Sequence, residues 1–175
     1  MQEEQVILVD EQDNELGTMN KLEAHQKGLL HRAFSVFVFN DQNELMLQQR
    51  AQHKYHSGGL WTNTCCSHPR PNEVLDTGIH RRLMEEMGFD CDIHYAFKFL
   101  YKAELDRGLT EHELDHVFIG HYDGTPKLNP EEACDWKYMS IEAIEQEMQE
   151  VPERYTEWFK IILKQHRNKF LTIKA

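Results

Sequence analysis

The chain has 175 residues, of which 40% are hydrophobic, and a net charge of −11, so it can form one domain with its own core. The acidic balance argues against a nucleic-acid surface, which needs clustered Lys and Arg to meet backbone phosphates. The sequence contains no apolar run near the roughly 20 residues that span a bilayer. We therefore expect a cytoplasmic monomer with no membrane or nucleic-acid partner.

The first half of the chain is predicted to be mainly extended. An apolar run at residues 5–10 and the polar turn after it indicate an opening hairpin, and residues 21–26 a helical turn. Residues 32–39 have the aromatic and β-branched composition of a buried strand, with residues 44–50 as its partner. The segment 61–73 is too polar for the core and too bounded by proline for regular structure, so we interpret it as an active-site loop.

The next segment predicts a helix over residues 73–87. Leu75, Ile79, Leu83 and Met87 recur every four residues, which gives one apolar stripe, and Gly88 follows where such a helix would end.

The rest of the chain predicts strands and then two helices. Residues 97–102 and 114–122 are interpreted as strands joined by an acidic stretch, and residues 136–139 as another. Helices are expected at residues 141–150 and 153–170, separated near Pro152. Strands first, a central helix and final helices predict an α+β sandwich around a mixed sheet.

Residues 67–89 resemble a Nudix box, whose pattern is G-x5-E-x7-R-E-U-x-E-E-x-G-U with U apolar. The matching residues are Glu73, Arg81, Glu85, Glu86, Gly88 and Phe89. Ser67 replaces the first glycine and Arg82 replaces a glutamate. Positions 82, 85 and 86 share one helix face, where three carboxylates would gather magnesium for pyrophosphate hydrolysis. Arg82 disfavours that cluster of metal ions.

Three strings make the chain similar to the type I isopentenyl-diphosphate isomerases: AHQKGLLHRAF, WTNTCCSHP and TEHELDHVF. The resemblance runs from about residue 6 to the final helix. It implies a single Nudix-type α/β/α sandwich domain over residues 1–175. It also implies interconversion of isopentenyl and dimethylallyl diphosphate, which are isoprenoid precursors. That reaction protonates and deprotonates an alkene through a tertiary carbocation.

The resemblance implies one metal site with three His and two Glu ligands. The matching residues are His25, His31, His68, Glu111 and Glu113. Glu111 and Glu113 alternate on an extended segment, so both can face one ion while His112 points away. A mixed imidazole and carboxylate set suits Mn²⁺ or Zn²⁺.

The resemblance also implies the catalytic and substrate-binding residues. Cys66 and Glu113 would carry the two protons, with Tyr101 sharing the Glu113 proton, and which of the two acts as acid stays open. Trp158 would face the carbocation. The diphosphate would be bound by Lys21, Arg50, Lys54 and Arg82, with Glu86 holding Mg²⁺.

Simpler interpretations apply to several of these side chains. Trp158 and Tyr101 could be core residues, Lys21 and Lys54 solvated charges, and Glu85 a surface partner of Arg81 or Arg82. The histidines outside the metal set are expected at the surface, namely His53, His56, His80, His94, His112, His116, His121 and His166.

Two other functions fit parts of the sequence. A Nudix pyrophosphohydrolase would share the fold, but it would favour Glu over Arg82 and would not need Cys66. A metal-binding or redox-sensing module could use the histidines and the adjacent Cys65 and Cys66 without turnover. The four cysteines lack zinc-knuckle spacing and the density of secreted disulfide scaffolds, so we expect free thiols. Neighbours on an extended segment point to opposite faces, so one of Cys65 and Cys66 is expected to be buried and the other exposed.

Overall fold

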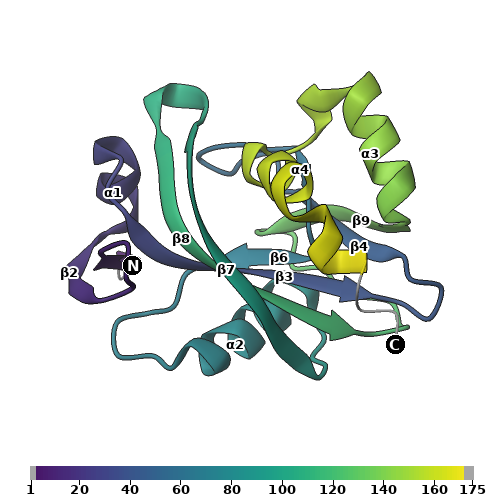
Figure 1. The fold of residues 1–175 in the computed structure, drawn as a ribbon, viewed down its shortest axis with the longest axis horizontal. Helices are drawn as coiled ribbons and strands as arrows, with labels where there is room; N and C mark the ends of the chain where they lie inside the picture. Colours follow the sequence, from purple (N-terminus) through teal and green to yellow (C-terminus); the bar gives the residue numbers. More distant parts are fainter. Residues whose placement is uncertain (1–2, 172–175) are drawn as a thin grey trace.

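The computed structural model describes residues 3–171, which form a mixed sheet with helices on both faces (Figure 1). Its strands are β1 (Gln5–Val9), β2 (Glu15–Asn20), β3 (His31–Phe39), β4 (Leu45–Arg50), β5 (Trp61–Thr62), β6 (Cys65–Ser67), β7 (Ile93–Glu104), β8 (Thr110–His121) and β9 (Ala133–Met139). Its helices are α1 (Lys21–Lys27), α2 (Leu75–Met87), α3 (Ile141–Glu150) and α4 (Glu157–Leu171), with 3₁₀ turns at Asp106–Gly108 and Pro152–Arg154.

Strand β3 is the centre of the sheet. It pairs antiparallel with β1, β4 and β6, and parallel with β8 from His31 opposite Glu113 to Phe39 opposite His121. Strand β8 also pairs antiparallel with β7, as the long hairpin in Figure 1. Strand β9 extends the sheet beside β4. The first hairpin and the strands predicted within β3, β4, β7, β8 and β9 are confirmed, and the sheet is mixed as expected.

Alternate residues of β3 face two separate cores. Phe34, Val36 and Val38 belong to the core that contains the apolar stripe of α2. Phe37 belongs to the core that contains Phe159 of α4 and Ile144 of α3. Because side chains alternate along a strand, both faces of β3 are covered. This confirms the predicted α/β/α sandwich.

The predicted helix 73–87 is confirmed as α2, which begins at Leu75. It ends where Gly88 adopts a left-handed conformation with φ 68° and donates its backbone N–H to the carbonyl of Met84. Glycine adopts this conformation without a Cβ clash. The helix buries Ile79, Leu83 and Met87.

The interpretation of segment 61–73 as a loop too polar for the core is wrong in its first half. β5 and β6 lie there, and Asn63 and Thr64 are fully buried. Their side chains bond the backbone, because Thr64 Oγ1 donates to Met46 O at 2.7 Å and Asn63 Nδ2 to Val36 O at 3.0 Å. Polar side chains can be buried when all their bonding groups are satisfied.

Two other boundaries also differ from prediction. The stretch expected to connect two strands is itself strand at both ends, so that Glu111 and Glu113 lie within β8. The final helix begins at Glu157 and not at 153, since a 3₁₀ turn over Pro152–Arg154 precedes it. None of the helices in residues 3–171 is long and apolar enough to cross a membrane.

Candidate active site

A cavity of about 1030 Å³ contains most of the predicted site residues in its lining. Those that line it are Lys21, Arg50, Lys54, Cys66, His68, Arg82, Glu86, Tyr101, Glu111, Glu113 and Trp158. His25 and His31 are fully buried beside His68, with ring centroids 5.9 and 5.0 Å from its ring. The structure therefore brings all the predicted residues to one region.

Strand register explains why residues distant in sequence converge. Ser35 of β3 is opposite Cys66 of β6, His31 is opposite Glu113 of β8, and Glu113 is opposite Tyr101 of β7. Residues opposite each other on neighbouring strands point to the same face of a sheet. The alternation along β8 also directs His112 away, and its Nδ1 lies 3.1 Å from Gly28 O.

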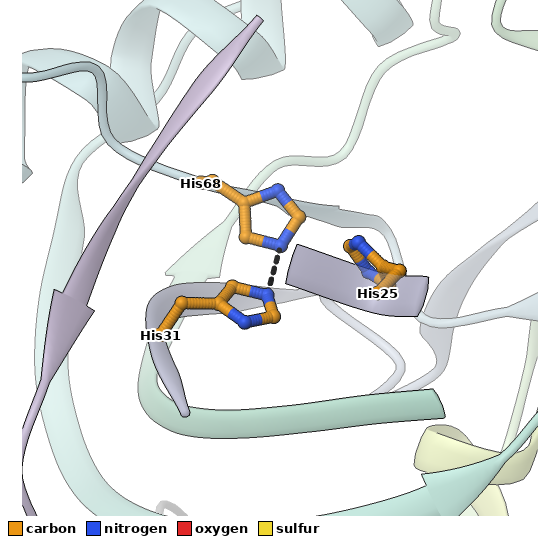
Figure 2. A group of neighbouring side chains, drawn as sticks. All are labelled: His25, His31 and His68. Atoms are coloured by element: carbon orange, nitrogen blue, oxygen red, sulfur yellow. Dashed lines mark hydrogen bonds between the residues drawn. The ribbon is translucent and has the colours of Figure 1, made fainter. Parts of the chain in front are cut away.

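Three histidines form a compact group of nitrogen donors (Figure 2). His25 lies on α1, His31 begins β3, and His68 follows β6. Their donor atoms lie within 4.8 Å of one another, and Nε2 of His31 is 3.3 Å from Nε2 of His68. Two local hydrogen bonds orient the rings, since Nδ1 of His25 is 2.7 Å from Lys21 O and Nδ1 of His31 is 2.9 Å from Leu29 O.

Two carboxylates complete this group. Oε2 of Glu113 lies 2.9 Å from Nε2 of His68 and 3.5 Å from Nε2 of His31. Oε2 of Glu111 lies 3.9 Å from Nε2 of His25. The Tyr101 hydroxyl bonds Glu113 Oε1 at 2.7 Å and also contacts Glu111. One phenol therefore joins the two glutamates.

Burial and neighbouring charged groups together set the protonation of this group. Burial lowers the pKa of His25 to about 4, so the ring is neutral near pH 7. Burial and the Glu113 charge raise the pKa of Glu111. Burial alone would also raise the pKa of Glu113, but its bond with Glu111 and the charge of His68 outweigh burial and lower that pKa. The pKa values of the two glutamates are therefore shifted in opposite directions, and Glu113 is the one that favours the charged form.

These residues fit a divalent metal ion. Nε2 of His25 is buried and has no hydrogen-bond partner among residues 3–171. A buried polar atom without a partner is costly, and a metal ion would satisfy a neutral imidazole nitrogen. The neighbouring carboxylates supply the negative charge that a divalent cation requires.

The adjacent cysteines face opposite sides of the sheet, as predicted. Cys65 is fully buried in the α2 core, and its thiol donates to Glu86 Oε2 at 3.3 Å. The Cys66 thiol faces the cavity and donates to Asn63 Oδ1 at 2.9 Å. Burial and the Asp115 carboxylate raise the pKa of Cys66, so the thiol carries its proton at neutral pH.

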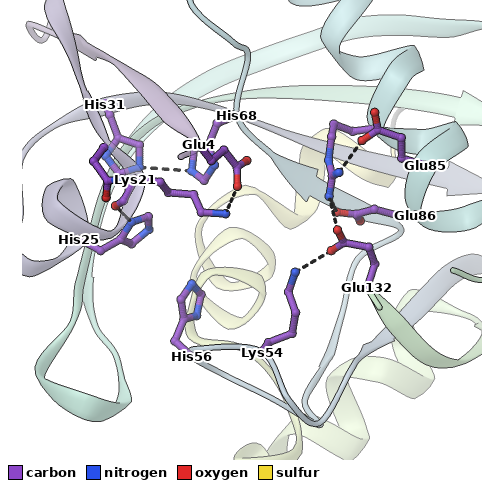
Figure 3. Close-up of polar contacts among 12 residues, drawn as sticks. Glu4, Lys21, His25, His31, Lys54, His56, His68, Glu85, Glu86 and Glu132 are labelled. Carbon is purple, nitrogen blue, oxygen red and sulfur yellow. Dashed lines mark hydrogen bonds and ion pairs between the residues drawn. The ribbon is translucent and has the colours of Figure 1, made fainter. Parts of the chain in front are cut away.

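Several cations line the same cavity, and Figure 3 shows Lys21 beside the histidines and Lys54 farther along, next to Glu132. Nζ of Lys54 lies 2.6 Å from Glu132, and Nζ of Lys21 pairs with Glu4. Arg50 places its guanidinium carbon 5.3 Å from the ring centroid of Trp158. A cation placed over an aromatic face is attracted electrostatically to the ring.

Arg82 and Glu86 form the end of the cavity at α2. Nη2 of Arg82 lies 2.5 Å from Glu86 Oε1 and 3.2 Å from Glu132 Oε1. The other Glu86 oxygen accepts from Gln48 Nε2 at 3.0 Å. Glu85 pairs with Arg81 and Arg82 on the helix surface, as the simpler interpretation predicted.

Two histidines expected at the surface are buried. His56 is 5% exposed because the loop after β4 folds it against Trp158 and His25. His116 is 8% exposed, and its Nε2 lies 3.1 Å from Asp13 Oδ2 in the turn between β1 and β2. Both contacts are between residues distant in sequence, which no spacing pattern indicates.

Sequence reasoning also missed polar neighbours of Cys66. Ser35 Oγ lies 3.6 Å from the Cys66 sulfur and donates to Asp115 Oδ2 at 2.6 Å. The strand alternation that places Glu111 and Glu113 on one face extends to Asp115. This alternation could have indicated that Asp115 also faces the site. Arg70, Tyr55 and Glu132 also line the cavity.

The chain matches known proteins at the levels of domain, sequence and fold. Residues 29–159 match the NUDIX domain model. The chain is 55% identical over 161 residues to isopentenyl-diphosphate Delta-isomerase 2 of Aromatoleum aromaticum, covering 92% of this chain and 85% of that protein. It is 52% identical to isopentenyl-diphosphate Delta-isomerase of Pectobacterium atrosepticum, covering 90% and 88%.

Solved structures agree on the fold. A Deinococcus radiodurans crystal structure superposes with a TM-score of 0.77 at 15% identity, covering 94% of this chain and 100% of that one. A MutT protein from Methanosarcina mazei superposes with a TM-score of 0.61 at 19% identity, covering 82% and 91%. At such identities the structures show a shared fold alone. With the sequence matches above, the chain belongs to the NUDIX domain family and, within it, to the isopentenyl-diphosphate Delta-isomerases.

Proposed function

We propose that this chain interconverts isopentenyl diphosphate and dimethylallyl diphosphate. The observation that carries the proposal is the lining of one cavity by two separate proton carriers, Cys66 and the Tyr101–Glu113 pair, together with a group of cations. The reaction requires a proton to join the terminal alkene carbon and another to leave carbon 2. Two proton carriers and an anion-binding region are the groups that this chemistry needs.

Cys66 and Glu113 are the proposed proton carriers. The pKa of Cys66 is raised by burial, so the thiol holds a proton that it can deliver to an alkene. Tyr101 bonds Glu113 directly and can share the proton that the glutamate takes or gives. Because the reaction is reversible, each carrier acts as acid in one direction and as base in the other. Proton transfer to the terminal carbon leaves a tertiary carbocation, and loss of the carbon 2 proton restores a double bond.

Trp158 is the proposed partner of the carbocation. The side chain lines the cavity and is 4% exposed. An aromatic face stabilises a desolvated cation by about 2 kcal/mol or more. Burial of the ring also excludes water, which would otherwise add to the cation.

The metal proposed for the His25, His31, His68, Glu111 and Glu113 set is Mn²⁺ or Zn²⁺, since these ions accept mixed nitrogen and oxygen donors. When bound, the ion would supply positive charge that lowers the pKa of Glu113. Tyr101 would then help this carboxylate to hold a proton through their hydrogen bond. Glu86 is the proposed carboxylate for Mg²⁺, whose charge would neutralise the diphosphate.

The diphosphate is assigned to Lys21, Arg50, Lys54 and Arg82. All four line the cavity, and three of them pair with carboxylates that a diphosphate could replace. Local cations of this kind let a chain with net charge −11 bind an anion. We further propose a cytoplasmic location, where free cysteines stay reduced, and a monomer.

Pyrophosphate hydrolysis is the main competing activity. A Nudix hydrolase would gather metal on three carboxylates at positions 82, 85 and 86, but Arg82 pairs with both glutamates here. A guanidinium among the ligands repels a second cation.

The test incubates purified, metal-replete protein and Mg²⁺ with labelled isopentenyl diphosphate. We expect an acid-labile allylic product with no release of phosphate or pyrophosphate. Dimethylallyl diphosphate as the starting material should yield the reverse conversion. Phosphate release without allylic product, or no reaction in metal-replete protein, would overturn the proposal.

A further inference from the structure

His56 is a buried histidine outside the three-His, two-Glu set. It lies between β4 and β5, is 5% exposed, and its ring centroid is 5.6 Å from that of His25. Figure 3 shows His56 on the same side of the cavity as His25. A buried imidazole needs partners for its nitrogens.

The two ring nitrogens of His56 have different surroundings. Nδ1 lies 3.1 Å from Ser57 Oγ, which supplies a local partner. Nε2 lies 4.0 Å from Oε2 of Glu111, beyond hydrogen-bond distance. The Nε2 atom of His25 faces the same carboxylate oxygen at 3.9 Å and has no hydrogen-bond partner among residues 3–171. Two imidazole nitrogens thus face one carboxylate oxygen without bonding it.

The two separations, 3.9 and 4.0 Å, are too long for hydrogen bonds and lie between the two spacings that ligands of one ion adopt. Two ligands that are each about 2.1 Å from one ion lie about 3 Å apart if adjacent and about 4.2 Å apart if opposite. Donor atoms of His25, His56 and Glu111 lie within 4.8 Å of one another. A small inward movement of the side chains would bring all three to a common centre.

The backbone holds His56 in this place. The main-chain N–H of Ser57 donates to Asp106 Oδ1 at 3.0 Å, and Nη2 of Arg50 donates to the His56 carbonyl at 3.1 Å. A Cβ on Gly58 would lie 2.5 Å from Gln52 O, so the loop returns on itself tightly. These contacts fix the main chain that carries the imidazole.

We propose that His56 is a further ligand of the metal centre, binding through Nε2 beside His25 and Glu111. It would be a sixth protein donor, and the site would accept an ion that prefers six ligands. The inference concerns metal affinity and coordination. It can therefore fail while the isomerase activity stands, and it can hold if the isomerase activity is not found.

The test compares His56→Gln and His56→Glu with His53→Gln. His53 belongs to the same loop, but its side chain is 59% exposed and pairs with Glu131, so its replacement is a matched control. The Gln and Glu replacements of His56 are nearly equal in size, but only Glu supplies a strong ligand. Each protein is stripped of metal, checked for folding by circular dichroism, and titrated with Co²⁺ or Mn²⁺ without substrate.

We expect one ion per chain at this site in every variant. His56→Gln should weaken affinity at least about tenfold and change the visible Co²⁺ spectrum, while His53→Gln changes neither. His56→Glu should bind more tightly than His56→Gln, which separates a lost ligand from damaged packing. Unchanged affinity and spectrum in His56→Gln would overturn the proposal. So would two ions in the parent protein and one in His56→Gln, because His56 would then serve a separate centre.

Discussion

The Cys66 thiol donates a hydrogen bond to Oδ1 of Asn63 over 2.9 Å. The Asn63 amide cannot flip without losing two hydrogen bonds, because its Nδ2 donates to the carbonyls of Val36 and Cys65 at 3.0 and 3.1 Å. Oδ1 also accepts from the Thr62 hydroxyl at 2.9 Å. A fixed acceptor therefore orients the thiol proton at the cavity wall.

Asn63→Ala should lower kcat for isomerisation while leaving KM nearly unchanged. The thiol would lose its oriented acceptor, and a loss of about 1–3 kcal/mol corresponds to roughly fivefold to 150-fold in rate. Thr62→Val is the control, since it removes a donor to Asn63 and leaves the amide in place. Steady-state kinetics would measure kcat and KM, and a thermal melt would check that each variant is folded. A normal kcat in folded Asn63→Ala would show that Asn63 does not need to orient the Cys66 thiol.

Cys66→Ala should nearly abolish turnover in a folded protein, whereas Cys65→Ala should keep most of it. Cys66 faces the cavity, but Cys65 faces the α2 core and bonds Glu86. Losing that bond and a small buried group should cost about 1 kcal/mol of stability. Allylic product formation and urea unfolding measure the two effects. Equal loss of activity in both variants would contradict the assignment of Cys66.

Sequence patterns predicted most of this fold because its strands and helices obey simple periodicities. The four-residue repeat from Leu75 to Met87 predicted α2, and the alternation of Glu111 and Glu113 predicted that both face one side. The opposite orientations of Cys65 and Cys66 followed from the same rule. The family strings supplied the site residues, since periodicity alone does not assign chemistry.

The predictions that were wrong share a physical cause. Asn63 and Thr64 were judged too polar for the core, but their side chains bond backbone atoms of Val36 and Met46 on other strands. His56 is expected in solvent, but the neighbouring Ser57 bonds Asp106, which lies 49 positions after Ser57. Burial of a polar residue depends on partners that only the tertiary structure brings close.

His68→Ala should lose metal first and activity as a consequence. Nε2 of His68 lies 2.9 Å from Glu113 and 3.3 Å from His31, so it belongs to the densest part of the donor group. Removal of a ligand should weaken metal binding by at least about tenfold. Metal content by mass spectrometry and activity would be measured at increasing Mn²⁺. His112→Ala is a control because its ring points away from the donors. An inactive His68→Ala with full metal content would assign it another role.

Gly88→Ala should destabilise the protein by more than Gly108→Ala does. Both glycines have left-handed φ values, 68° and 71°, so each substitution incurs a backbone cost of about 1–2 kcal/mol. At Gly88 a Cβ would also lie 2.2 Å from Lys127 O, whereas at Gly108 nothing lies within 4 Å. Urea unfolding of both variants measures the difference. Equal free energies of unfolding would show that the Lys127 carbonyl can move away from the new Cβ at little energetic cost.

Arg82→Ala should raise KM for isopentenyl diphosphate more than it lowers kcat. The guanidinium lines the cavity and can exchange its contacts with Glu86 and Glu132 for phosphate oxygens. Loss of a charged hydrogen bond of about 1.5–3 kcal/mol predicts roughly a tenfold to hundredfold rise in KM. Arg82→Lys keeps the charge but loses the planar fork, so its KM should lie between those of the parent and the alanine variant. Steady-state kinetics at saturating Mg²⁺ measures both. A KM unchanged by Arg82→Ala would remove this residue from the diphosphate site, and its contacts with Glu86 and Glu132 would then be structural.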